Sequence, residues 1–169
     1  QWRKVHLGID AHTLERRASE GTDNSVGDAP MLPELLAQIP LDEPVASVGG
    51  DGAYDTKGCH AAIAQRGAQA VIPPRKNARP WRQTLEGAGG RNEALRACQR
   101  LGRRIWKKWS GYHRRSLVET KMHCFKRLGE RVMARTFERQ VTELHVRVAL
   151  LNRFTQLGRP ATVPVPAVA

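Results

Sequence analysis

The sequence has few cysteines and lacks any long apolar run, and both shortages restrict the class of protein. Its three cysteines, Cys59, Cys98 and Cys124, lie far apart and form no CxxC pair. This odd, scattered set argues against a disulfide framework or a zinc ribbon, and it favours a reducing compartment with the thiols as small core residues. No apolar stretch approaches the ~20 residues of a membrane span, and no signal peptide opens the chain. We therefore expect a cytoplasmic protein with no membrane partner.

Acidic residues are scarce beside basic ones, at 16 Asp and Glu against 28 Lys and Arg, for a formal charge of +12. Such an excess favours a polyanionic partner and says nothing about the fold. Residues 96–139 hold fourteen Lys and Arg against three acids, whereas residues 1–72 hold six against ten. An acidic first half joined to a basic second half predicts a cation site that a nucleic-acid surface closes over. The alternative is a set of solvated helix faces.

The pattern of apolar residues predicts an α/β fold, and 169 residues, 40% of them hydrophobic, suffice for one compact core. Residues 4–10 alternate apolar and polar side chains, which predicts a strand, and residues 14–19 can return as its antiparallel neighbour before a loop at 21–27. The next predicted elements are a helix at 29–39 capped by Asp28, a short buried strand at 45–48, and a helix capped by Thr56 that runs to about Gln65 and is ended by Gly67. They are followed by a strand at 69–72, an exposed basic loop at 75–90, and helices at 92–109, 112–128 and 137–154. This order predicts a mixed sheet with flanking helices.

Two aspartates end predicted strands and are candidate site residues. Asp10 ends the first strand on the face opposite Val5, Leu7 and Ile9, and Asp51 follows the strand after the first helix. Side chains at the ends of neighbouring strands can meet at one rim of a sheet, where ligands often bind. The competing interpretation is that each aspartate merely forms a turn, because Gly-Asp-Gly is ordinary turn chemistry.

The predicted helix at 112–128 carries Glu119, the single acid in a strongly basic stretch. At about 100° per residue, Tyr112, Arg115, Glu119 and Lys126 fall within a stripe about 60° wide. A carboxylate one turn from a guanidinium suits a metal-held phosphate, because the acid binds a hard cation while basic groups neutralise phosphate oxygens. An amphipathic helix would also produce such a stripe by chance.

The spacing Tyr-x2-Arg-x3-Glu-x6-Lys resembles the signature of DDE transposases in the four/five group of bacterial insertion sequences. Other stretches resemble that group too, especially its fifth subfamily: His6-Leu-Gly-Ile-Asp10, Gly50-Asp-Gly-Ala-Tyr-Asp55, Ile72-Pro-Pro-Arg-Lys-Asn-Ala78 and Trp106-Lys-Lys-Trp-Ser-Gly-Tyr-His-Arg-Arg-Ser116. The resemblance covers nearly the whole chain up to Pro160. It implies an RNase H-like catalytic domain at residues 1–157, followed by a Pro-rich disordered tail at 158–169.

The resemblance also implies a catalytic site, a cofactor and a partner. By position the catalytic and metal-binding triad is Asp10, Asp51 and Glu119, holding two Mg²⁺ (or Mn²⁺) ions roughly 4 Å apart for in-line displacement at phosphorus. The implied partner is DNA, both element ends and target, with a homo-oligomer as the active complex and a place at the bacterial nucleoid. The predicted DNA contacts are Tyr112, Arg115, Lys126, Arg75, Lys76, Lys107, Lys108 and Trp109; for Trp106 and Trp109, packing in the core is the alternative to stacking on a base.

The start of the chain bears on its activity. The first residue is Gln, and the predicted first strand begins only a few residues later. Full transposases of this group carry an end-recognition region before that strand, so we expect a fragment or the product of a downstream reading frame. The expected function is metal-dependent DNA cleavage and strand transfer. The alternatives are a non-catalytic DNA-binding remnant that competes with the intact enzyme, and an RNase H-like nuclease without joining activity.

Overall fold

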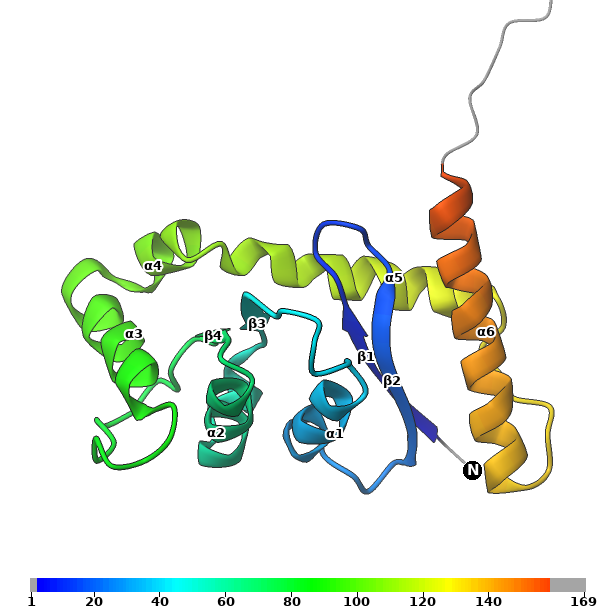
Figure 1. The fold of residues 1–169 in the computed structure, drawn as a ribbon, viewed down its shortest axis with the longest axis horizontal. Coiled ribbons are helices and arrows are strands. Elements are labelled where there is room, and N and C mark those ends of the chain that lie inside the picture. Colours follow the sequence, from blue (N-terminus) through cyan, green and yellow to red (C-terminus); the bar gives the residue numbers. More distant parts are fainter. Residues whose placement is uncertain (1–2, 159–169) are drawn as a thin grey trace, which may run out of the picture.

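The computed structural model of the chain describes residues 3–158 and shows a mixed α/β protein (Figure 1). In chain order the elements are β1 (Arg3–Ile9), β2 (Arg16–Asp23), η1 (Ala29–Met31), α1 (Leu32–Ala37), β3 (Ser47–Gly49), η2 (Gly52–Tyr54), α2 (Lys57–Gln65), β4 (Gln69–Val71), α3 (Ala88–Leu101), α4 (Arg103–Trp109), η3 (Tyr112–Arg115), α5 (Ser116–Arg127) and α6 (Phe137–Leu157). The predicted tail at 159–169 lies outside the described residues. Among those described, no helix is long and apolar enough to cross a bilayer.

The predicted single mixed sheet is wrong for the described residues, which form two separate two-stranded sheets. β1 pairs antiparallel with β2, and β3 pairs parallel with β4. Side-chain amides cover part of the edge of β2 that faces away from β1: Gln38 bonds both the N–H and the C=O of Ser19, and Asn152 bonds both backbone groups of Arg16. At these two residues the amides take the hydrogen bonds that a third strand would need.

Two apolar clusters lie beside the two sheets. Around β1, the cluster centres on Phe125 from α5 with Leu144 and Val148 from α6. Around β3 and β4, it is built from α1 and α2 and centres on the buried side chains of Leu32, Leu36, Cys59, Ile63 and Ile72. The last helix therefore has one apolar face, with Leu144 and Val148 buried against the β1–β2 sheet.

The polar face predicted for β1 is also covered. His6 is only 5% exposed, with Nε2 2.9 Å from Thr22 Oγ1 and Nδ1 3.3 Å from the Asp28 carboxylate. Burial lowers the pKa of His6, although the charge of Asp28 opposes this change. Asp28 therefore partners His6 and does not cap the next helix with its side chain, contrary to the prediction.

Several predicted boundaries shift for local reasons. The predicted helix at 29–39 is a 3₁₀ turn followed by the short α1, since Pro30 and Pro33 interrupt its backbone donors. The predicted loop at 21–27 starts later, because β2 continues to Asp23. At Gly21 a Cβ would lie 3.0 Å from Leu144, so α6 approaches this strand closely. The predicted buried strand at 45–48 is β3, in which Ser47 and Gly49 are exposed.

In the basic half of the chain, α4 and α5 run along one side of the molecule, with α3 at one end and α6 at the other (Figure 1). The predicted helix at 92–109 begins earlier, at Ala88, and breaks at Gly102, where φ is +84°. That backbone conformation favours glycine and separates α3 from α4. The predicted helix at 112–128 starts with the 3₁₀ turn η3 before α5. The cap at Thr56 is confirmed, since its Oγ1 accepts a hydrogen bond from the N–H of Cys59.

Candidate functional site

Asp10 lies immediately after β1 and shapes the turn into β2. Its Oδ1 accepts hydrogen bonds from the N–H groups of Thr13 (3.0 Å) and His12 (2.6 Å). These two bonds hold the pKa of Asp10 below its ordinary value, because they favour the charged carboxylate. Within residues 3–158, no hydrogen bond involves its other oxygen, Oδ2. The carboxylate is thus fixed in direction through one oxygen, with the second available to a ligand.

Asp51 has the same arrangement after β3. Its Oδ1 accepts a 2.8 Å hydrogen bond from the N–H of Ala53 and caps the 3₁₀ turn η2. The preceding Gly50 packs tightly on the Tyr54 ring, because a Cβ there would lie 3.1 Å from the ring. Burial, followed by the charges of Asp28 and Asp51, raises the pKa of Tyr54 to about 12. Asp51 therefore forms the turn through one oxygen, and its second oxygen has no hydrogen bond in the described part of the chain.

Glu119 lies in the first turn of α5, where its side chain is 61% exposed. Its Oε1 is 2.8 Å from Nη2 of Arg115, one turn earlier. The Arg115 guanidinium also stands 5.7 Å from the centre of the Tyr112 ring, and the Lys107 ammonium stands 5.0 Å from the same ring. Tyr112, Arg115 and Glu119 are therefore neighbours, as their spacing predicts. Lys126 occupies the exposed last turn of the same helix.

The segments that carry the three acids approach one another. α5 packs against β1, which Asp10 follows, and η3 packs against β3, two residues before Asp51. Arg114 of η3 reaches His12 in the β1–β2 turn, with 3.3 Å between Nη1 and Nε2. In residues 3–158, however, no three His, Cys, Asp or Glu side chains gather in an arrangement that could hold a metal ion. The assignment of the three acids to one metal site therefore stays a prediction.

The predicted DNA contacts differ in exposure. Lys76, Lys108 and Lys126 are exposed, and Trp109 is 74% exposed on α4. Trp106, one turn earlier, is 3% exposed and packs beside Tyr112, so it is the core residue of the pair. Lys107 is half-buried over the Tyr112 ring.

Arg75 is also exposed, and its guanidinium faces the protein's own backbone. Nε lies 3.4 Å from the carbonyl oxygen of Gly52, and Nη2 lies 3.3 Å from that of Ala53. A role for this residue as a phosphate contact stays a prediction.

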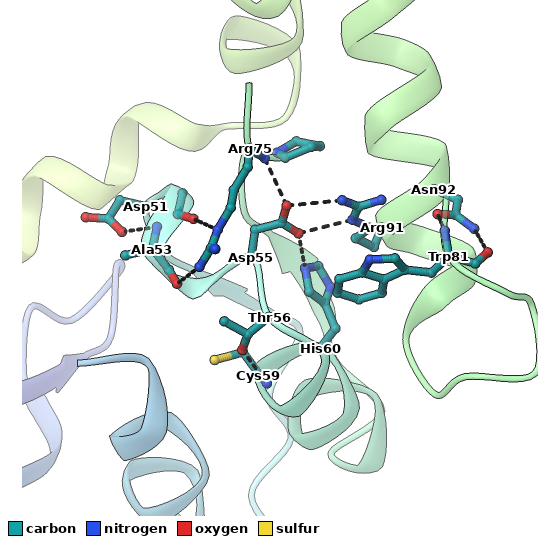
Figure 2. A network of polar contacts seen from close by, with 12 residues as sticks. Asp51, Ala53, Asp55, Thr56, Cys59, His60, Arg75, Trp81, Arg91 and Asn92 are labelled. Atoms are coloured by element: carbon teal, nitrogen blue, oxygen red, sulfur yellow. Dashed lines mark hydrogen bonds and ion pairs between the residues drawn. The ribbon is translucent and has the colours of Figure 1, made fainter. Parts of the chain in front are cut away.

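A buried polar network beside the candidate site centres on Asp55, as Figure 2 shows. Arg91 of α3 forms two hydrogen bonds to its carboxylate, at 3.1 and 3.2 Å, and the N–H of Arg75 adds a third at 2.9 Å. His60 Nε2 lies 3.2 Å from Asp55 Oδ1. Burial would raise the pKa of Asp55, but the hydrogen bonds from His60, Arg91 and Arg75 outweigh it and hold the pKa far below its ordinary range.

No pattern in the sequence predicts this network. In the sequence, Asp55 stands out only as the end of the stretch Gly50–Asp55, and Arg91 looks like one more cation of a basic region. Trp81 completes the packing: the Arg91 guanidinium lies 4.4 Å from the centre of its ring, and His60 meets that ring edge-on at 5.2 Å. Asn92 pairs with both backbone groups of Trp81 at 2.8 Å. The one sequence signal was an arginine next to an asparagine near the start of a helix, which alone is uninformative.

The fold and site define a mixed α/β protein in which two strand-end aspartates lie beside the strongly basic helices α4 and α5, and α5 carries the exposed Glu119. Residues 1–153 match the family model described as "Transposase DDE domain". The chain belongs to this family of transposase domains. The family implies an RNase H-like fold, here with small sheets, together with DNA binding, transposase activity and the general use of divalent metals. No solved structure gives a significant match to the chain.

Proposed function

We propose that residues 1–157 form the catalytic domain of a transposase that cleaves DNA at insertion-sequence ends and transfers the strand to target DNA. The element belongs to the four/five group, close to its fifth subfamily, because of the sequence motifs around Asp10, Asp51 and Glu119. The observation that carries the proposal is the match over residues 1–153 to the transposase family, together with the approach of η3 and α5 to the ends of β3 and β1. The partner is DNA at the nucleoid, and the active complex contains more than one copy of the chain.

The donor set fits Mg²⁺ or Mn²⁺. These hard cations prefer carboxylate oxygens, and Asp10 and Asp51 each leave one oxygen unbonded within residues 3–158. Asp10, Asp51 and Glu119 are the residues that would hold two ions. When bound, the ions supply a water nucleophile at neutral pH and stabilise the leaving 3′ oxygen.

Arg115 has two candidate partners in this proposal, Glu119 and a DNA phosphate. A guanidinium forms bidentate hydrogen bonds with phosphate, as it does with carboxylate. If Arg115 turns to the scissile strand, the Glu119 carboxylate is released from its present 2.8 Å ion pair. Lys126, on the same helix as Glu119, neutralises a neighbouring phosphate. The Tyr112 ring, which the Arg115 guanidinium faces, orients the Arg115 side chain. Arg115 thus links DNA binding to the availability of Glu119.

The second candidate function is a non-catalytic DNA-binding remnant that competes with the intact enzyme. The Arg115–Glu119 ion pair favours it, because an acid already neutralised by its neighbour is a poorer metal ligand. The exposed Trp109 and its neighbouring lysines would still bind DNA in such a protein.

The test is cleavage of DNA that contains the ends of the encoding element by the purified chain with Mn²⁺ or Mg²⁺ added. We expect nicking by the wild type and none by Asp51→Asn, which removes a ligand charge. Asp42→Asn, an exposed acid in a turn, is the matched control and should cleave normally. Equal cleavage by wild type and Asp51→Asn would refute the triad. DNA binding without any cleavage by the wild type would favour the remnant.

A further inference from the structure

Arg75 follows β4 at the point where the parallel pair β3–β4 ends. Asp51 leaves the same edge, two residues after β3, and the N–H of Gly50 bonds the carbonyl of Val71 at 3.3 Å. Between β4 and Arg75 the chain passes through Pro73 and Pro74, both buried. Because proline has a fixed φ, this exit path is stiff, and it directs Arg75 towards the turn after Asp51.

The contacts of Arg75 converge on that turn. Ala53 is held from two sides: its N–H donates to Asp51 Oδ1 at 2.8 Å, and its carbonyl accepts from Arg75 Nη2 at 3.3 Å. The carbonyl of Gly52 accepts from Arg75 Nε at 3.4 Å. Each guanidinium bond is long and individually weak. Two parallel donors on adjacent carbonyls nevertheless restrict the turn more than a single contact would.

The root of Arg75 is anchored more firmly than its tip. Its backbone N–H donates to Asp55 Oδ2 at 2.9 Å, and Asp55 is 5% exposed and bound to Arg91. The turn that bears Asp51 is thus connected through Arg75 and Asp55 to α3, as Figure 2 shows. An outward-pointing phosphate ligand would need neither the carbonyl contacts nor this buried anchor.

We propose that Arg75 is a positioning residue: its guanidinium clasps the carbonyls of Gly52 and Ala53 and fixes the direction of the Asp51 carboxylate. The inference rests on the proposed function for its catalytic consequence, and it replaces the sequence-based role of Arg75 as a phosphate contact. Lys76, the next residue, is exposed, and within residues 3–158 its ammonium group makes no hydrogen bond or ion pair. Lys76 keeps the phosphate role.

The test compares Arg75→Gln, Arg75→Lys and Lys76→Gln in the full chain. Lys76→Gln should reduce the slope of log affinity against log salt for element-end DNA by about one, as loss of one phosphate contact does. Arg75→Gln should leave that slope at the wild-type value. Arg75→Gln should lower two quantities, each by about 10- to 100-fold: the affinity of the DNA-free protein for Mn²⁺, and the single-turnover cleavage rate at saturating DNA. This is the range for residues that orient metal ligands. Arg75→Lys should not rescue it, because an ammonium cannot span two carbonyls as a planar fork does.

Amide hydrogen exchange at Ala53 in the free protein supplies a readout that does not depend on catalysis. We expect faster exchange in Arg75→Gln and wild-type exchange in Lys76→Gln. If Arg75→Gln lowers the salt slope by about one and keeps the wild-type exchange, rate and Mn²⁺ affinity, Arg75 is a phosphate contact and the inference is overturned. If the wild type neither cleaves nor binds Mn²⁺ while exchange at Ala53 still accelerates in Arg75→Gln, the clasp stands and the proposed function fails.

Discussion

Replacing Asp55 with asparagine should destabilise the protein strongly. Oδ1 of Asp55 accepts from Arg91 Nε and faces His60, while Oδ2 accepts from Arg91 Nη2 and from the N–H of Arg75. In either orientation an asparagine amide presents its NH₂ group to two of these donors. Arg91, only 3% exposed, would be left without a charged partner. Removing one member of a buried ion pair costs about 3–5 kcal/mol.

Thermal and urea unfolding, followed by circular dichroism at pH 7, measure this loss. For a chain of this length the expected decrease in Tm is roughly 6–20 °C, at about 2–4 °C per kcal/mol. Asp42→Asn removes the same charge from an exposed turn, so its Tm should stay near that of the wild type. A loss below about 1 kcal/mol for Asp55→Asn would refute the view that this carboxylate holds the network together.

The double variant Asp55→Asn/Arg91→Met tests the same reasoning from the other side. Without the guanidinium there is no unpaired buried charge, so the double variant should be more stable than Asp55→Asn alone. The coupling energy from the four-protein cycle should be favourable to the native pair by about 0.5–3 kcal/mol. Additive losses would show that Arg91 is stabilised by Trp81 and its other contacts rather than by Asp55.

Three further predictions concern pH, packing and DNA. Because the folded-state pKa of Asp55 lies below its ordinary value of about 3.9, its contribution is complete above roughly pH 5 and is lost as pH falls; urea titrations at pH 7 and pH 3.5 should therefore show a larger acid loss for the wild type than for Asp55→Asn. Gly87→Ala should lower the free energy of unfolding in urea by more than about 2 kcal/mol, since φ is +74° and a Cβ would lie 2.4 Å from the His60 carbonyl oxygen. The control Gly89→Ala has open space around the new Cβ in α3 and should raise that free energy by about 0.5–1 kcal/mol. Trp109→Ala should change stability by less than about 0.5 kcal/mol and weaken single-stranded DNA binding by about 1–3 kcal/mol in fluorescence titrations, and unchanged affinity would exclude stacking by this residue.

Local signals in the sequence predicted local structure well. Thr56 and Gly67 bound α2 because capping and the left-handed turn depend on a few adjacent residues. The closeness of Arg115 and Glu119 likewise follows from helical spacing alone. These predictions need no knowledge of the tertiary fold.

Predictions that depend on distant residues failed or were not made. No local sequence pattern near β2 predicts that the side-chain amides of Gln38 and Asn152 bond the strand where a third strand could pair. Asp55 and Arg91 are 36 positions apart, and an arginine in a basic region gives no sign that it is buried. The sequence predicts the turn at Asp51 but not the contacts from Arg75, since hydrogen bonds from a side chain to backbone carbonyls produce no repeating pattern in the sequence.

The covered edge of β2 also affects how separate molecules meet. An uncovered strand edge is a template on which another chain can add a strand, the first step towards ordered aggregates. At Ser19 and Arg16 the amides of Gln38 and Asn152 already occupy the groups that an incoming strand would use. With two side chains the protein thereby blocks strand addition at these two positions of its longest strand when neighbouring copies are concentrated.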